Sequence, residues 1–308
     1  MYAINYFPSK VLGLSYLAGT IMYAFLGFIG IALYYVIAIR IIPLNVKIKG
    51  YFLFPALFFM PNLHFWSGGI GKDTILFSCI AIFVYSLLKI NNRIILLLCS
   101  LGLSYIVRPH ITLFLLVSFS LAYLIASKIS VAKRIFLALA LIAVGLVILP
   151  KVMEYANIEE TSIESFNKYS NTRAINLSEA HTGSSVDISS YSLPVKIFTF
   201  LYRPLFFDIN GIPAIIASFE NLILLLLTFM VLRQKPIYTF RSAPLIIKGL
   251  LILLILGTLV FSSSLGNLGI MIRMRNMFLP GLMLLIMWSF SLKEELKRKR
   301  RGLDNYQS

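Results

Sequence analysis

The sequence predicts an all-α, polytopic integral membrane helical bundle. Of its 308 residues, 59% are hydrophobic and the mean hydropathy is +0.87. Only 13% are charged, against roughly 25% in an average soluble domain. A soluble protein this apolar could not cover its surface with polar groups, whereas side chains that face lipid need no water.

We expect about nine membrane spans, because a helix needs about 20 apolar residues to cross the hydrocarbon core. They are predicted at residues 11–39, 51–66, 70–88, 93–108, 110–127, 133–151, 212–232, 245–263 and 268–290. The second and fourth are short, which leaves tilted, re-entrant or broken helices open. Pro55, Pro61 and Gly68-Gly69 favour a broken helix there, since Pro and Gly interrupt helical hydrogen bonding. The whole chain, 1–308, is expected to form one membrane domain.

The distribution of basic residues predicts the orientation. The tail at 291–308 is the strongest basic cluster, and the short connections 40–49, 89–93, 128–134 and 233–248 carry Lys or Arg and no acid. Positive residues favour the cytoplasmic side, which places the C-terminus in the cytoplasm. The segment 152–211, with seven acids, then becomes one long outer loop, either an ordered lid or a flexible loop. It ends in an aromatic, interfacial stretch at about 193–207.

The same topology accounts for the formal net charge of +16. Because the basic residues lie in connections between apolar runs, we expect a membrane and not nucleic acid as the partner. Cys79 and Cys99 both lie inside apolar runs, and no spacing of Cys and His is typical of a metal site. We therefore predict no metal and no other cofactor. The N-terminal apolar stretch is too long for the core of a cleavable signal peptide.

Unusual polar residues gather on the predicted outer side. They are His64, Lys72, Asp73, Arg108, His110, Arg203, Asp208, Glu220, Arg273 and Arg275. The positive-inside rule does not predict outer arginines, and a charge within a span costs about 2.5–3.5 kcal/mol on insertion scales. Such residues usually pair with one another, line a wet cavity or bind a ligand.

Each of these residues also has a purely structural explanation. Lys72 and Asp73 could form a neighbouring ion pair at a helix start. Arg108 and His110 could mark the membrane boundary, and Arg203 could anchor the interfacial stretch. Glu220, an acid within an apolar helix, needs a basic partner, for which Arg273 and Arg275 are the candidates. Because residues two apart on a helix point in different directions, one of these arginines could pair while the other faces a cavity.

The glycines before Lys72 do not form a nucleotide-binding P-loop. Trp66 stands where the first Gly of that motif belongs, and Asp73 replaces the Ser or Thr after the Lys. Glycines and a lysine before a helix start could still hold a diphosphate through backbone N–H groups and charge.

Four stretches together resemble a family of uncharacterised polytopic proteins encoded among bacterial polysaccharide genes. Pro61-Asn62-Leu63-His64-Phe65-Trp66-Ser67-Gly68-Gly69-Ile70-Gly71-Lys72-Asp73 resembles their P-x-x-x-F-W-S-S-G-x-x-K-D/E motif, and Arg108-Pro109-His110 their R-P-H turn. The stretch from Tyr202-Arg203-Pro204 to Phe219-Glu220-Asn221, and that from Gly266-Asn267-Leu268-Gly269 through Arg273-Met274-Arg275 to Pro280, resemble two further motifs. The resemblance covers most of the chain from about residue 50 onward.

In general plan these proteins are similar to GT-C-type membrane glycosyltransferases and to O-antigen polymerases. The resemblance implies a multi-pass protein of the bacterial cytoplasmic (inner) membrane, acting in surface-polysaccharide biosynthesis on polyprenyl-phosphate-linked sugars at the outer face. Membrane lipid and other polysaccharide-assembly proteins are the further partners it implies. One departure matters: GT-C enzymes carry a catalytic acid in a large first outer loop, whereas about ten residues precede the first span here. No catalytic base is therefore carried over.

The expected function is transfer or polymerisation of glycans from a polyprenyl-diphosphate carrier. Arg273, Arg275 and Arg108, assisted by Lys72, would hold the diphosphate, because guanidinium groups suit phosphate. Asp73 is the first candidate for the base that deprotonates the acceptor hydroxyl, with Asp208 and His110 as alternatives. The predicted substrate-binding set also includes Arg203, Glu220 and His64. A lipid-linked glycan transporter or flippase, and a non-catalytic subunit of the assembly complex, remain alternatives.

Overall fold

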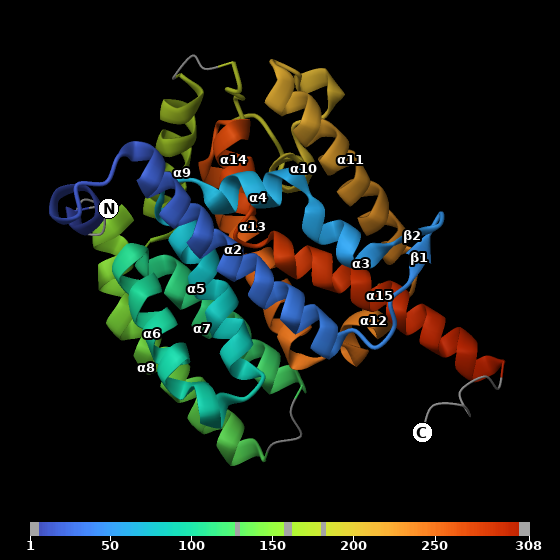
Figure 1. The fold of residues 1–308 in the computed structure, drawn as a ribbon. Coiled ribbons are helices and arrows are strands. Elements are labelled where there is room, and N and C mark those ends of the chain that lie inside the picture. The colour runs from blue at the N-terminus through green and yellow to red at the C-terminus, as the bar shows by residue number, and fades with distance from the viewer. Residues whose placement is uncertain (1–5, 127–129, 157–161, 180–182, 302–308) are drawn as a thin grey trace.

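The protein is described by a computed structural model that covers residues 6–126, 130–156, 162–179 and 183–301. Its regular structure is almost entirely helical (Figure 1). In chain order the elements are η1 (Phe7–Val11), α2 (Tyr16–Ile41), β1 (Lys47–Ile48), β2 (Tyr51–Phe52), α3 (Leu53–Ala56), η2 (Leu57–Phe59), α4 (Pro61–Gly68), α5 (Lys72–Leu87), α6 (Ile90–Val107), α7 (Pro109–Ala126), α8 (Val131–Ala156), α9 (Ile163–Ser178), α10 (Leu193–Tyr202), η3 (Phe206–Asp208), α11 (Ile212–Leu232), α12 (Pro236–Ser242), α13 (Leu245–Ser264), α14 (Leu268–Arg275) and α15 (Leu279–Arg300).

The helices confirm an all-α bundle of the kind that crosses a membrane several times. In the described residues, six helices are long and apolar enough to span a bilayer, namely α2, α6, α7, α8, α11 and α13. Two bent pairs bring the number to eight if each pair is one span: α4 with α5, bent by 110°, and α14 with α15, bent by 61°. The predicted count of about nine is not confirmed.

The predicted span at 51–66 is not a single helix. It contains the end of a short hairpin (β2), one turn of α3, the 3₁₀ turn η2 and the first residues of α4. Lys49 and Gly50 have positive φ angles of 48° and 89°, which suits a two-residue hairpin turn. The segment runs back along α2, where the ring of Phe54 lies 4.5 Å from that of Tyr35. Pro55 and Pro61 interrupt helical hydrogen bonding, which explains why this apolar stretch is irregular.

The break predicted at Gly68-Gly69 is confirmed. It separates α4 from α5, and Thr74 in the first turn of α5 donates a hydrogen bond to the carbonyl of Gly69. The second bent pair corrects the prediction of one continuous span at 268–290. There the chain leaves the helix after Arg275 and starts again with Pro280 in the first turn of α15, a position that needs no backbone N–H donor.

Small residues let the helices approach closely. A side chain at Gly27 would collide with the backbone of Ser67, and one at Gly281 with the carbonyl of Leu250. Ser78 adds a hydrogen bond of 2.7 Å from its hydroxyl to the carbonyl of Leu26, joining α5 to α2. In a membrane such close packing replaces the hydrophobic effect as the main force between helices.

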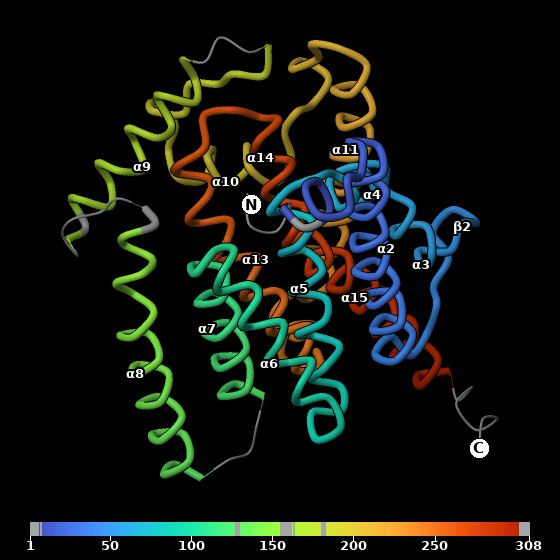
Figure 2. Tube along the Cα trace, turned by 60° about the vertical axis from the view of Figure 1, so that its left-hand side comes forward, coloured from blue at the N-terminus to red at the C-terminus, as the bar shows by residue number. Residues whose placement is uncertain are grey.

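One end of the bundle, which we call the site end, carries α9, α10, α14 and the first turns of α5, α7 and α11 (Figure 2). The end of α7, the start of α8 and the end of α15 lie toward the opposite end. Helix α8 stands at the edge of the bundle against α7, and Ile148 is the one buried apolar side chain among its described residues. This exposure is expected for a helix surrounded by lipid.

Much of the predicted loop 152–211 is ordered helix. Helix α9 packs so closely on the end of α13 that a side chain at Gly266 would collide with the carbonyl of Ala174. The chain after residue 182 then pairs with the start of α14: Val186 donates to the carbonyl of Gly266 and Leu268 to that of Ser184, both at 2.9 Å. Of the loop acids, Glu159 and Glu160 lie outside the described residues, as does the end of the basic tail, 302–308.

Candidate functional site

The centre of the site end is a carboxylate held by two arginines. Asp73 lies in the first turn of α5, and its side chain is only 4% exposed. One of its oxygens is 2.9 Å from Nη1 of Arg108, and the other is ion-paired with Nε of Arg273. The three residues come from α5, from the single-residue turn between α6 and α7, and from α14. Sequence positions up to 200 residues apart are thus joined by one carboxylate.

Backbone geometry holds these arginines in place. Arg108 is fixed by its N–H, which donates to Ser104 at 2.8 Å, and by its carbonyl, which accepts from Ile111. Gly71 lies directly against Arg273, because a Cβ added there would be 2.7 Å from Nη2. A methyl group at this position would force the guanidinium to shift. The glycine-rich stretch before α5 therefore positions an arginine, a role that the sequence did not reveal.

Further cations surround the trio. The imidazole of His110 is half-buried, stacks edge-on against Phe114 and Phe261, and lies within electrostatic range of Arg108, Lys72 and Arg173. Arg173 comes from α9 and is steadied by Tyr169, whose hydroxyl accepts a 2.7 Å hydrogen bond. The cluster formed by Lys72, Asp73, Arg108, His110, Arg173 and Arg273 is hereafter the cationic cluster. Within it, Asp73 is ion-paired with Arg108 and Arg273, and Lys72 and Arg173 lie within electrostatic range of His110.

This arrangement favours binding of an anion over proton abstraction by Asp73. Both oxygens of that carboxylate already face a guanidinium, so Asp73 acts in this geometry as the group that orients two arginines. Arg273 is the most accessible member of the trio, with 40% of its side chain exposed, against 12% for Arg108. Two guanidinium groups held close together by one carboxylate suit a phosphate or diphosphate group.

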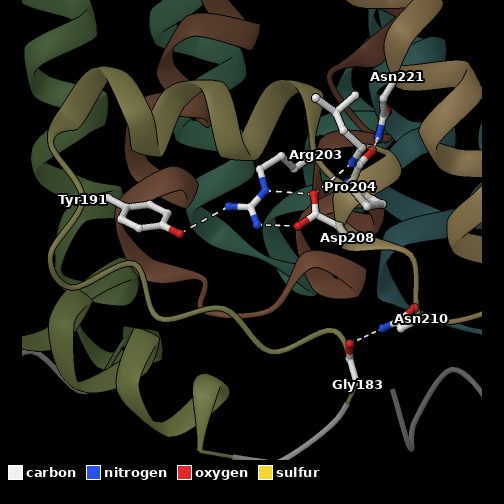
Figure 3. Close-up of polar contacts among 8 residues, drawn as sticks. Gly183, Tyr191, Arg203, Pro204, Asp208, Asn210 and Asn221 are labelled. Atoms are coloured by element: carbon white, nitrogen blue, oxygen red, sulfur yellow. Dashed lines mark hydrogen bonds and ion pairs between the residues drawn. The ribbon is translucent and has the colours of Figure 1, made fainter.

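Arg203 and Asp208 form a separate pair that braces the connection from α10 to α11 (Figure 3). Nε and Nη2 of Arg203 reach the two oxygens of Asp208 at 3.0 and 2.5 Å, and Nη1 reaches the hydroxyl of Tyr191 at 3.4 Å. Asp208 also accepts from the N–H of Leu205 at 2.9 Å. The hydrogen bond to Asp208 raises the pKa of Arg203 above its ordinary value. With both oxygens engaged, Asp208 is not available as the alternative base that we predicted.

Arg275 is a structural residue and not a phosphate ligand. Its side chain is fully buried, and it donates to the carbonyls of Phe200 and Leu201 and, at 2.6 Å, to Oδ1 of Asn221. Asn221 in turn donates to the carbonyl of Pro204 at 2.8 Å. Arg275 thus joins α14 to the end of α10 directly and, through Asn221 of α11, to Pro204 just after α10. Its predicted place in the diphosphate clamp is wrong in this geometry, because its donors point into the protein core.

The predicted pair of Glu220 with an arginine is also not formed. Oε2 of Glu220 accepts instead from the backbone N–H and the side-chain amide of Asn62, at 2.9 and 3.1 Å. Glu220 therefore holds the start of α4 against α11. His64 belongs to the same region: its Nε2 is 2.7 Å from the carbonyl of Phe58, and its ring stacks on Phe59. Neither residue is part of the cationic cluster.

An apolar cavity of about 530 Å³ opens beside the cluster. It is bounded by α4, by the chain around residues 183–184 and 204–213, by the start of α11, and by α14. Helix α14 contributes to both features, since Leu268, Gly269 and Ile272 line the cavity and Arg273 reaches Asp73.

No group of three or more His, Cys, Asp or Glu side chains that could hold a metal occurs among the described residues. Comparison of the chain with protein-family models, with curated proteins and with solved structures gave no match in any of the three.

The structure brings five of the ten predicted residues into the cationic cluster. They are Lys72, Asp73, Arg108, His110 and Arg273. Arg173 was missed, because an arginine within a long polar segment needs no special explanation. One sequence signal could have pointed to Arg173. It lies four residues after Tyr169 on a helix that begins after an N-cap serine, Ser162, so the two side chains meet on one face of that helix.

Proposed function

We propose that the protein transfers or polymerises glycans from a polyprenyl-diphosphate carrier at the outer face of a bacterial cytoplasmic membrane. The cationic cluster is the observation that carries this proposal. The diphosphate leaving group develops negative charge as its bond to the sugar breaks, and preorganised cations stabilise that charge. The orientation follows from the basic tail, which favours the cytoplasm for the end of α15 and thus the outer face for the site end.

The residues divide into two roles under this proposal. Arg273 and Arg108, oriented by Asp73, bind the phosphates, and Lys72 and Arg173 add positive charge around them. His110 is the candidate for the base that accepts a proton from the acceptor hydroxyl, because the other two candidates, Asp73 and Asp208, are both held by arginines. Asp73, as a residue that acts through the arginines, has a positioning role.

The first test combines glycan profiling with sized lipid-linked intermediates in a deletion strain. Complete repeat units that accumulate facing outward support the proposal. Accumulation confined to the inner leaflet would instead identify a flippase, and no change in either pool would rule out a role in glycan assembly.

Two substitutions at Gly71 and Gly69 test the cluster itself. Gly71→Ala places a methyl group against the guanidinium of Arg273, so we expect loss of glycan elongation at normal protein level. Gly69→Ala is the matched control, since the nearest atom to its new Cβ is 3.9 Å away. Normal elongation in Gly71→Ala would show that the position of Arg273 does not matter.

A further inference from the structure

The cavity beside the cationic cluster has walls that suit hydrocarbon better than sugar. Most of its lining is aliphatic, aromatic or proline, including Phe65, Ile216 and Ile272. Its four polar side chains are Asn62, Ser184, Asp208 and Asn210. A sugar would need several of them to bond its hydroxyl groups.

All four polar side chains already make bonds inside the protein. Asn62 donates to Glu220 at 3.1 Å, and Ser184 to Oδ1 of Asn267 at 3.1 Å. Asn210 donates to the carbonyl of Gly183, and Asp208 is paired with Arg203. A ligand rich in hydroxyl groups would have to break these bonds, whereas a hydrocarbon chain leaves them intact.

The cavity is also open to the apolar surface of the bundle. Phe65, Ile212 and Ile216 line it and are at the same time exposed large hydrophobic residues on α4 and α11. In a bilayer that surface meets lipid. A chain can therefore enter sideways from the membrane without crossing water.

The cationic cluster adjoins the cavity along α14, because Gly269 lines the cavity and Arg273 lies one helical turn after it on the same face. Ile272 lines the cavity, and Arg273, the next residue, is ion-paired with Asp73. The cavity thus lies next to a phosphate-binding surface, which is the charge pattern of a lipid with an anionic head.

We propose that this cavity holds the hydrocarbon chain of an isoprenyl phosphate whose head group lies on the cationic cluster. The inference rests on the proposed function and names the part of the substrate that the cavity takes. A chain bound here anchors the carrier laterally, beside the arginines that take its charged head.

The two tryptophans of the chain provide the measurement. Trp66 lines the cavity, whereas Trp288 lies on α15 and donates to the carbonyl of Thr239 at 3.2 Å. A Trp288→Phe protein leaves Trp66 as the only tryptophan, and a Trp66→Phe protein leaves Trp288 as the internal control. The probe is an isoprenyl phosphate with bromine in its terminal unit, added to the full-length protein in detergent micelles, because bromine quenches a nearby indole.

We expect saturable quenching of Trp66 and only weak, non-saturating quenching of Trp288. Ala214→Phe, which fills the cavity from α11, should raise the half-saturation concentration about tenfold or more. Ile215→Phe is the matched control, because Ile215 follows Ala214 on α11 but is exposed and does not line the cavity. Its binding curve should match that of the parent.

Three results would overturn the assignment. They are the absence of saturable Trp66 quenching, an unchanged curve for Ala214→Phe, and equal quenching by a brominated phosphatidylcholine at the same mole fraction. The last would identify bulk lipid as the occupant. This experiment measures binding and not glycan elongation, so the two proposals can fail separately. If Trp66 is not quenched but Gly71→Ala loses elongation, the chain-binding proposal fails and the proposed function stands. If Trp66 is quenched saturably but Gly71→Ala elongates normally, the proposed function fails and chain binding stands.

Discussion

Replacing Asp73 by Asn distinguishes a carboxylate that orients arginines from one that acts as a base. The side chain is 4% exposed and faces two guanidinium groups, one of them on Arg108, which is 12% exposed. Removing one partner of a buried ion pair costs about 3–5 kcal/mol, because the other charge stays buried without compensation. The pair with Arg273 adds at most about 1 kcal/mol, since that arginine is 40% exposed and its charge is screened.

We therefore expect Asp73→Asn to lower the free energy of unfolding by about 3 kcal/mol, mostly through Arg108. The Asn amide keeps the size of the side chain and can still accept a hydrogen bond, which places the loss at the lower end of the range. A catalytic base without a structural role would instead lose activity and keep its stability.

Thermal unfolding can be followed with the cysteines that the chain already has. Cys79 is 1% exposed and Cys99 is exposed, so in a Cys99→Ser background a fluorogenic thiol reagent reports unfolding through Cys79 alone. Asp187→Asn is the control, because this exposed acid bonds only to its neighbour Ser189 in the described structure. It should leave the unfolding temperature unchanged, whereas Asp73→Asn should lower it by several degrees.

A double variant provides the sharper result. Asp73→Asn combined with Arg108→Met removes both buried charges, so it should recover most of the stability lost by Asp73→Asn alone. If Asp73→Asn unfolds at the parent temperature and the double variant is no more stable, the carboxylate does not hold Arg108. The positioning role would then be refuted, and the assignment of Asp73 as the base would be restored.

Two further predictions concern residues that differ in burial. Arg275→Met leaves three buried acceptors without their donor and should lower the free energy of unfolding by about 3 kcal/mol or more. Arg273→Met, in contrast, should fold normally and lose only glycan elongation. Equal yields and equal unfolding temperatures for the two variants would contradict the assignment. Gly266→Ala forces a methyl group against the carbonyl of Ala174 and should detach α9 from α13, measured as faster proteolysis at the site end. Gly102→Ala is the control, because its new Cβ has nothing within 4 Å, and the protease should cut this variant at the rate of the parent protein.

The spans that the sequence predicted well are those with uninterrupted apolar runs. The predicted 212–232 coincides with α11, and 245–263 ends one residue before α13 does. The failures are stretches where composition is apolar but the backbone cannot continue. In 51–66 two prolines remove helical hydrogen bonds, and in 268–290 the chain bends by 61° between two helices that share one apolar run. Hydropathy alone carries no information about such a bend.

The candidate site was predictable as a group and not residue by residue. Topology placed Lys72, Asp73, Arg108 and Arg273 at the same end, and the structure joins them. The partners of each charge depend on packing between distant segments, which a single sequence does not encode in any local pattern. Asn62, for example, takes the carboxylate of Glu220, although arginine was the expected partner on electrostatic grounds.

Arg273 and Arg275 show why packing decides what an arginine does. They lie two residues apart on α14, so their side chains leave the helix in different directions. Arg275 points into the core, where it bonds backbone carbonyls and an amide but no carboxylate in the described structure, and its fixed role is to join α10 to α14. Arg273 points to the accessible edge, where Asp73 holds its Nε. Its other donors, Nη1 and Nη2, carry no ion pair within the described residues, so they are the groups of this helix that a phosphate can reach.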